Sequence, residues 1–436
     1  MRSAIQVELQ SLLGSRSLWI LSLLTGPLVG YSFMQAISLY GEASKPALVT
    51  PQLAVGLNPF DGIIIPTYGA IYLALTLLFP FLVIRMISTD KDSGALRLLL
   101  QTPLSSSTLL AAKVMAALFA WLVVELPGLF VLLLWRLFGG HLFVPETLCL
   151  LVGHFLYGVI VIAIALFAAA IAENGSTAGL LALACTLGSW VLDFAAASNE
   201  RSWLARAASL SLTALLKSFE QGLLGWSVIV GIVLTGGGLF ALTLVWWHPG
   251  IRLSFKLRGT GTVLAACATL LLLTPQVTGS VDLTEDQRHS FTPAVRAALL
   301  QIREPLRITA YLAPEDPRMM DFDRSILAKL RRILPRTEIV NREADQAAIF
   351  RTGEDPDYGV VIYEVGSRRA ESRSTSPEEV LPLLWNLAGV SPPAADDPAA
   401  YPGYPLVVSS PRAAELSFYV LWPALSLVGW LLFSRR

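Results

Sequence analysis

Residues Leu109–Phe138 read LLAAKVMAALFAWLVVELPGLFVLLLWRLF, an apolar run that is long enough to decide the class of fold. A helix rises about 1.5 Å per residue, so roughly 20 apolar residues cross a bilayer core about 30 Å thick. Other runs of this kind are Leu18–Leu39, Ile65–Ser88, Thr147–Ala172, Ser176–Ala197, Gly222–Trp247, Gly259–Gly279 and Glu415–Phe433. The sequence therefore predicts a polytopic α-helical membrane protein with about eight transmembrane helices.

The composition agrees with lipid as the main solvent. Hydrophobic residues make up 54% of the 436 residues and charged residues 15%, whereas soluble chains carry about 25% charged residues. The formal net charge is zero, so we expect no nucleic-acid partner. Cys149, Cys185 and Cys267 all lie in apolar runs, and the four histidines are scattered, so we predict neither disulfides nor a metal site.

The distribution of charge predicts the orientation in the membrane. With a cytoplasmic N-terminus, eleven lysines and arginines of the short loops and termini fall inside and five outside, which satisfies the positive-inside rule. Residues 279–414 hold 20 of the 32 acids and 16 of the 32 bases, so this block lies outside lipid. We expect a bacterial inner (cytoplasmic) membrane protein with both termini cytoplasmic and residues 279–414 periplasmic or extracellular.

Two amphipathic segments flank the early spans. In Ser3–Leu13, four apolar residues share one face, which suits a helix on the inner membrane surface over residues 1–17; a cytosolic extension of the first span is the alternative. Residues Asn199–Gln221 repeat leucine and alanine at helical spacing, so we predict an interfacial helix on the outer face.

The connection Arg85–Lys113 reads RMISTDKDSGALRLLLQTPLSSSTLLAAK. Asp90 and Asp92 precede Ser93-Gly94, and acids at a helix start complement its partial positive charge. Thr102-Pro103 then ends the helix, since proline disfavours helical geometry at the preceding residue. We predict a short helix, Ala95–Leu100, whose apolar face binds a protein or rests on the bilayer. That face comprises Leu96, Leu99 and Leu100.

This connection resembles the coupling segment of type-2 ABC exporter (ABC-2) permeases. The positions assigned to coupling are Asp90, Asp92, Gly94, Ala95, Leu96, Leu99, Leu100, Thr102 and Pro103, with Lys113 following. The family's usual acid is glutamate, so Asp90 departs from the pattern. The resemblance implies a six-helix permease domain over 18–258, a partner cytoplasmic ABC ATPase that acts as a dimer, and a homodimer or heterodimer of permeases.

No G-x-x-x-x-G-K-[ST] phosphate loop occurs in the chain. We therefore predict a transporter subunit and not an enzyme, with no cofactor of its own. ATP and Mg would be bound by the partner ATPase.

Residues 279–310 read GSVDLTEDQRHSFTPAVRAALLQIREPLRITA and follow the predicted seventh span, 259–279. The phrases Asp282-Leu283-Thr284, Ser290-Phe291-Thr292 and Glu304–Ile308 resemble gliding-motility-type (Gld-like) auxiliary subunits of ABC exporters. The resemblance implies a permease fused to a shortened auxiliary domain, which could bind a periplasmic partner.

The pattern of strands and helices in the charged block predicts an α/β domain over residues 280–389. The expected elements are strand Leu306–Leu312, helix Asp321–Leu334, strand Thr337–Asn341, hairpin Tyr358–Val365 and Arg368–Arg373, and helix Glu378–Leu387. This order is typical of a thioredoxin-like or related domain, although the lack of cysteine excludes thiol chemistry. The proline-rich stretch 390–414 is a predicted tether to the last span, and 415–436 comprise that span and a basic C-terminus.

Three ionisable residues fall inside predicted spans: Glu125, Asp193 and His154. Because burying such groups is costly, each is a candidate for a substrate path, although a structural role is the simpler alternative. The competing class of function is a membrane-anchored assembly or sensory protein whose outer domain binds a partner. An intramembrane enzyme would need a paired nucleophile and base or a metal constellation, which the sequence does not offer.

Overall fold

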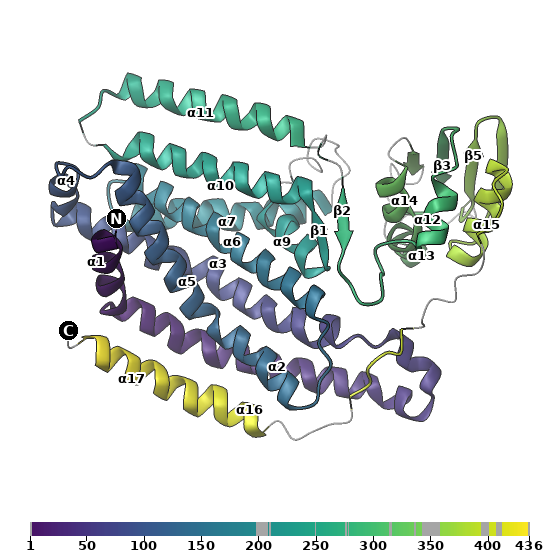
Figure 1. Ribbon diagram of the computed structural model, residues 1–436, viewed down its shortest axis with the longest axis horizontal. Helices are drawn as coiled ribbons and strands as arrows, with labels where there is room; N and C mark the ends of the chain where they lie inside the picture. Colours follow the sequence, from purple (N-terminus) through teal and green to yellow (C-terminus); the bar gives the residue numbers. More distant parts are fainter. Residues whose placement is uncertain are drawn as a thin grey trace.

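The computed structural model describes residues 2–197, 208, 211–248, 250–274, 277, 279–313, 316–334, 337–341, 358–393, 401–406 and 412–434. Figure 1 shows a bundle of long helices with a small α/β domain at one end. Eight helices of this part are long and apolar enough to cross a membrane, which confirms the polytopic fold. They are α2 (Arg16–Val49), η2–α3 (Phe60–Ile64 and Ile65–Asp92), α5 (Ser106–Leu137), α6 (Val144–Ile171), α7 (Gly175–Ala197), α10 (Trp226–Trp247), α11 (Leu253–Leu273) and α16–α17 (Arg412–Leu416 to Trp422–Ser434).

The helices differ from the predicted runs mainly at their ends. α2 continues ten residues beyond Leu39 to Val49, because a short polar stretch does not by itself stop a helix, and the helix runs on through Pro46. α11 begins at Leu253, six residues before the predicted start, and ends at Leu273, shortly before Pro275. Counting apolar residues therefore finds a span but does not fix where its helix begins and ends.

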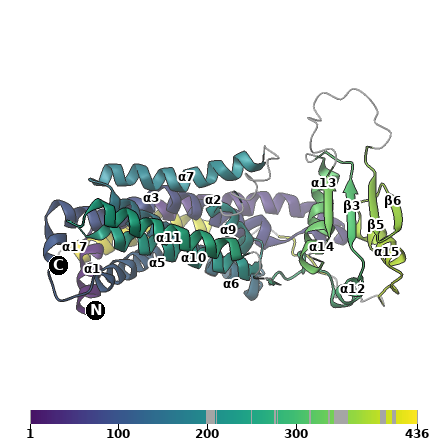
Figure 2. The ribbon, with the colours of Figure 1, turned by 90° about the horizontal axis from the view of Figure 1, so that it is seen from above.

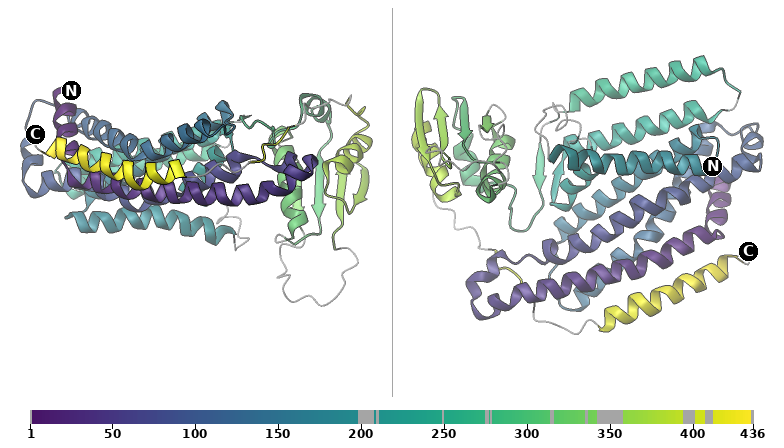
Figure 3. Two further views of the ribbon diagram at one scale, coloured as in Figure 1. Left: turned by 90° about the horizontal axis from the view of Figure 1, so that it is seen from below. Right: turned by 180° about the vertical axis from the view of Figure 1, so that it is seen from behind.

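The last span packs along the first. Figure 3 shows the yellow α17 beside α2, and the two helices approach at Gly26 and Gly30. A Cβ atom at Gly26 would lie 2.0 Å from the Trp422 ring, and one at Gly30 would lie 2.3 Å from Phe418 Cβ. Small residues one turn apart thus let two large aromatic side chains seat against α2.

Two short helices complete the bundle. Helix α1 (Arg2–Leu13) crosses the ends of the spans and packs against α5, at the end where α17 also finishes (Figure 1). Helix α9 (Leu212–Glu220) buries its apolar face against α6 and α7, where Phe219 lies over Gly153. α9 is therefore part of the bundle core, whereas we predicted a surface helix. Residues 199–207 and 209–210 of that prediction lie outside the described residues.

The small α/β domain, predicted over residues 280–389 and called the outer domain after its predicted location, is built on a four-stranded sheet in the order β4-β3-β5-β6. The strands are β3 (Leu306–Ala310), β4 (Glu338–Asn341), β5 (Val361–Val365) and β6 (Arg368–Ser372). β3 pairs in parallel with β4 and antiparallel with β5, and β5 and β6 form the predicted hairpin. Gly366 turns that hairpin with φ +60°, a conformation that glycine adopts without strain.

Helices cover one face of this sheet (Figure 2). They are α12 (Pro293–Leu299), α13 (Pro317–Phe322), η4 (Asp323–Leu327), α14 (Ala328–Ile333) and α15 (Pro377–Ala388). Ile308 and Tyr363, neighbours on β3 and β5, bury the same face, against Phe322, Leu330 and Leu384. The predicted order of strands and helices is confirmed by these elements.

Two contacts that we did not predict fix the domain to the bundle. β1 (Leu223–Gly225), directly after α9, pairs antiparallel with β2 (Ser280–Asp282). Within the predicted tether, Tyr404 donates its N–H to the carbonyl of Leu57 over 3.0 Å, and its ring stacks on His141 at 3.7 Å between centroids. Residues 401–406 of the predicted tether therefore lie against the bundle.

Candidate functional sites

The short helix predicted over Ala95–Leu100 is present as α4 (Ala95–Leu99), at the bundle end opposite the outer domain (Figure 1). Gly94 begins it with φ +74°, a left-handed conformation that ends α3 and turns the chain. Asp90 and Asp92 lie in the last turn of α3, so our prediction that they start the short helix is wrong. The acids complement no helix N-terminus here, because the Ser93-Gly94 break separates them from α4.

The apolar face of α4 also differs from the prediction. Leu96 is 5% exposed and packs into the bundle core, and Leu99 and Leu100 are half-buried. Leu98 is 68% exposed and stands beside the exposed Arg97. A helix of five residues has too few turns for its periodicity to reveal which face the bundle covers, and the free apolar side chain is Leu98.

A turn after α4 brings the chain back into α5. Thr102 donates its hydroxyl to the carbonyl of Leu99 over 2.6 Å, and Pro103 follows, exposed to solvent. Ser105 then caps α5 by accepting the N–H of Thr108. The two long helices are thus joined by a short connection with α4 at its tip.

A buried lysine holds the base of this connection. Lys113 on α5, 1% exposed, places its ammonium 2.6 Å from Asp90 Oδ2 and 2.8 Å from Glu8 Oε1, and donates to the carbonyl of Met86 over 3.1 Å. The two carboxylates come from α3 and α1. This cluster, Glu8–Asp90–Lys113, joins three helices through one charge that would be costly to leave unpaired.

A second lysine ties α3 to α6. Lys91 donates to the carbonyls of Ala169, Ala170 and Ala172, over 2.6, 3.0 and 3.0 Å. These carbonyls belong to the end of α6, where backbone acceptors lack helical partners and a cation is favourable. Adjacent residues of α3 therefore bind α5 on one side and α6 on the other.

The predicted substrate-path residues Glu125 and His154 meet inside the bundle. His154 Nδ1 lies 3.8 Å from Glu125 Oε1, and His154 Nε2 lies 3.6 Å from Glu220 Oε1. The ring of Tyr68 lies 4.9 Å from the His154 ring, edge to face. Glu125 and His154 are 5% and 1% exposed.

Several polar atoms of this intrabundle cluster, defined as Tyr68, Glu125, His154 and Glu220, lack hydrogen-bond partners. Both carboxylate oxygens of Glu125, both ring nitrogens of His154 and the Tyr68 hydroxyl are buried without one among the described residues. Buried polar groups are normally paired, so the cluster has capacity to bind a polar group. The Asp193 side chain lies outside the described residues. Sequence reasoning missed Glu220, because α9 enters the bundle.

At the outer-domain end, one arginine bridges the two parts of the molecule. Arg288, from the connection between β2 and α12, pairs with Glu146 at the start of α6 and lies 3.0 Å from Asp61 at the start of η2 and 3.4 Å from Asp286. Glu146 is 1% exposed, so this ion pair is desolvated. Arg288 lies within residues 279–310, but nothing in the sequence indicated its partners.

Asp282 organises the same connection. Its carboxylate accepts the hydroxyl and N–H of Thr284, the hydroxyl of Ser290 and the N–H of His289, at 2.6 to 3.1 Å. Burial alone would raise the pKa of Asp282, but the hydrogen bonds from Thr284 and Ser290 outweigh it and hold the pKa below its usual value. The motif residues Asp282, Thr284 and Ser290 thus form one turn.

Comparison with known families agrees with the first part of the chain. Residues 3–192, which run from α1 into α7, match the family model described as ABC-2 family transporter protein. The match supports a permease component of an ABC transporter and covers α4 and the Glu8–Asp90–Lys113 cluster. It stops before α10, the sixth span of the predicted permease domain. No curated protein and no solved structure matches the chain.

Proposed function

We propose that this chain is the membrane-spanning subunit of an ABC exporter, driven by a separate cytoplasmic ATPase. The observation that carries the proposal is α4, a short helix with an exposed leucine, braced at the inner end of the region that matches ABC-2 transporters. The ATPase binds and hydrolyses Mg-ATP and docks on Leu98 and Arg97. A pair of permeases, identical or related, faces a pair of ATPases.

The helix η2–α3 supplies a mechanical link across the membrane. Its inner end carries Asp90 and leads into α4, and its outer end carries Asp61, which contacts Arg288 of the outer connection. A rigid helix moved at one end moves at the other, so displacement of α4 by the ATPase reaches the outer domain. The intrabundle cluster lies beside this helix through Tyr68 and would contact a polar part of the cargo.

The outer domain acts in this proposal as a binding element of Gld-like type, and its strand order suits a thioredoxin-like or related fold. The chain sits in a bacterial inner membrane, with α4 and both termini cytoplasmic. Ser93, just before α4, and Ser367, in the turn between β5 and β6, are both exposed. Figure 1 shows α4 and β5 at opposite ends of the molecule. As single cysteines, only the latter should react with an impermeant thiol reagent when the outer membrane is permeabilised; equal reaction of both would contradict the orientation.

The decisive experiment is recovery of the ATPase with purified variants. Burying one leucine contributes about 1.5–3 kcal/mol, so Leu98→Asp should lower affinity for the ATPase at least about tenfold. Leu137→Asp is the matched control, because Leu137 is 70% exposed and lies at the far end of α5. Undiminished recovery with Leu98→Asp would contradict docking on α4 and favour a membrane-anchored assembly or sensory protein.

A further inference from the structure

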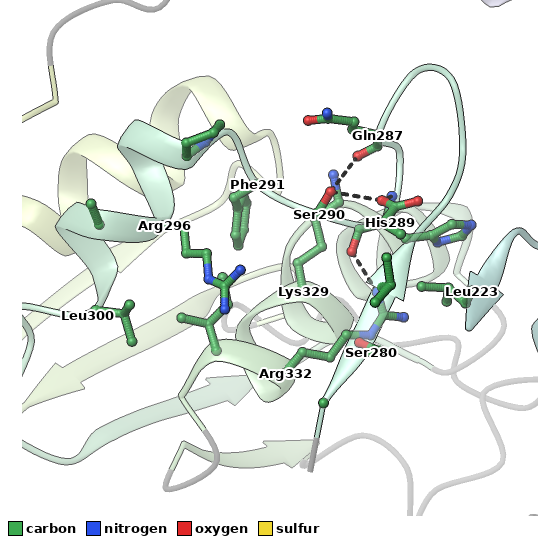
Figure 4. A pocket seen from close by; sticks show the side chains of 16 residues that line it. Leu223, Ser280, Gln287, His289, Ser290, Phe291, Arg296, Leu300, Lys329 and Arg332 are labelled. Atoms are coloured by element: carbon green, nitrogen blue, oxygen red, sulfur yellow. Dashed lines mark hydrogen bonds between the residues drawn. The ribbon is translucent and has the colours of Figure 1, made fainter. Parts of the chain in front are cut away.

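A cavity of about 550 Å³ opens between strand β2 and the helices of the outer domain (Figure 4). Its walls are the Asp282–Phe291 connection, α12 and the η4–α14 helix, and Leu223 of β1 contributes from the bundle side. Cavities of this size accommodate a small organic molecule rather than a single ion. The site is separate from α4 and from the intrabundle cluster.

The cavity is lined by three cations from two helices. Arg296 comes from α12, and Lys329 and Arg332 come from α14. None of the three forms a salt bridge with any residue that the structure describes; Arg332 donates to the carbonyl of His289 over 2.6 Å. The only acid of the lining is Asp282, whose oxygens are already engaged by the turn described above. A concave surface with this excess of positive charge attracts anions.

Two groups of the lining, the ammonium of Lys329 and the imidazole of His289, are partly desolvated. The Lys329 ammonium lies 5.4 Å from the centre of the Phe291 ring, and burial lowers the pKa of this lysine. The imidazole Nε2 of His289 is buried and has no hydrogen-bond partner among the described residues. A cation held against an aromatic ring and an unpaired ring nitrogen are features that a bound polar group would satisfy.

Beside these groups and the polar Ser280, Gln287 and Ser290, the cavity has an apolar wall. Leu223, Val281, Phe291, Leu300 and Ile333 contribute, and Leu300 is 56% exposed. Leu223 belongs to the strand that leads directly into the apolar helix α10, so the cavity adjoins the end of the membrane bundle. Cations and apolar side chains in one cavity match a molecule that has both a charged and an apolar part.

From this arrangement we propose that the cavity binds the anionic headgroup, a phosphate or a carboxylate, of an amphiphilic molecule. Arg296, Lys329 and Arg332 bind the headgroup, His289 offers an uncharged polar contact, and the leucines cover the first carbons of the apolar part. This assignment goes beyond the transport role, because it holds whether the amphiphile is cargo or a lipid of the surrounding membrane.

The test uses the full chain, purified without ATPase in an uncharged maltoside detergent. Dihexanoyl phosphatidylglycerol is titrated below its micellar concentration, with dihexanoyl phosphatidylcholine and inorganic phosphate in parallel, and affinity is measured by thermophoresis. We expect phosphatidylglycerol to bind at least tenfold more tightly than either alternative. Arg296→Gln with Lys329→Gln should weaken it at least tenfold. Arg331→Gln should change it less than twofold, because Arg331 lies on the same helix but pairs with Asp323.

Equal affinity for phosphatidylcholine would show that charge is not recognised, and equal affinity for phosphate would show that no amphiphile is needed; either result overturns the proposal. So does an equal loss in Arg331→Gln. Unliganded melting of each variant checks folding. Should the double variant fail to fold, Arg296→Gln alone, at an exposed side chain, serves the same comparison. Because no ATPase is present, failure here leaves the docking experiment on α4 untouched.

Discussion

Lys113 of α5 and Asp90 of α3 form an ion pair of 2.6 Å. The next residue of α3, Lys91, donates to the carbonyls at the end of α6. The Lys113 side chain is almost fully buried, whereas the Asp90 side chain is 24% exposed. Glu8 of α1 shares the same ammonium. The region in front of α4 is therefore held by charge at a point where three helices meet.

Asp90→Asn should destabilise the protein through this pair. Removing one partner of a buried ion pair costs about 3–5 kcal/mol, and we expect about 2 kcal/mol here because Glu8 remains and Asp90 is partly exposed. Thermal unfolding of the purified chain measures this loss of stability. Asp92→Asn, at an exposed side chain two residues away, is the control. Adding Lys113→Met to Asp90→Asn should cost less than the sum of the two single changes; strict additivity would show that the pair is not coupled.

Alanine should have opposite effects on stability at a glycine inside the contact between the first and last spans and at a glycine outside it. Gly26→Ala should destabilise by about 1–3 kcal/mol, because the new methyl group would overlap Trp422. Gly69→Ala should be neutral or stabilise by up to about 1 kcal/mol, since no atom lies within 4 Å of its added Cβ.

The same contact can be measured directly by cross-linking. Ser22 Oγ and Ser426 Oγ lie 3.1 Å apart, so cysteines at both positions, in a chain without the native cysteines, should form a disulfide. The yield should fall in Gly26→Ala and not in Gly69→Ala. Equal yields would show that α17 does not depend on Gly26 for its position.

Local signals account for the parts of the fold that the sequence predicts. A span needs only a long apolar run, and the hairpin needs only two alternating runs around Gly366, so both could be found without knowing any neighbour. The buried face of α4 could not be predicted, because a helix of one and a half turns is too short for a hydrophobic repeat. The bundle covers Leu96 and leaves Leu98 exposed.

The site contacts depend on residues far apart in the chain. Lys113 meets Glu8 across 105 positions and Arg288 meets Glu146 across 142. Charge and hydrophobic pattern along a single sequence carry no information on such pairs. Glu125 and His154 could be singled out by the cost of burying them, but their approach to Glu220 requires α9 to enter the bundle, which the amphipathic pattern alone does not distinguish from a surface helix.

Arg288→Gln should loosen the outer domain from the bundle. It leaves Glu146 buried without its cation, which costs about 3–5 kcal/mol. Arg307→Gln is the control, because Arg307 and Glu338 pair on an exposed surface, where solvent screens the charges and such pairs contribute little to stability. Adding Glu146→Gln to Arg288→Gln should restore part of the lost stability. If Arg288→Gln melts like Arg307→Gln, the junction is not held by this pair.

His289 should make the stability of the outer connection depend on pH. Burial lowers the pKa of His289 from 6.5 to about 4, with Arg288 and Arg332 acting in the same direction and Asp282 and Asp286 opposing it. Because the folded protein disfavours the protonated ring, the unfolded chain binds the proton first as the pH falls. The stability from the neutral ring is therefore complete above pH 6.5 and is lost progressively between about pH 6.5 and 4.

The measurement is the melting temperature of the full chain against pH, compared with that of His289→Gln. Other carboxylates titrate in both proteins, so the difference between the two curves isolates the histidine. We expect the wild-type chain to lose more stability than His289→Gln between pH 7 and 4.5, because glutamine takes up no proton in that range. Parallel curves would mean that the imidazole is solvated and is protonated as readily in the folded protein as in the unfolded chain.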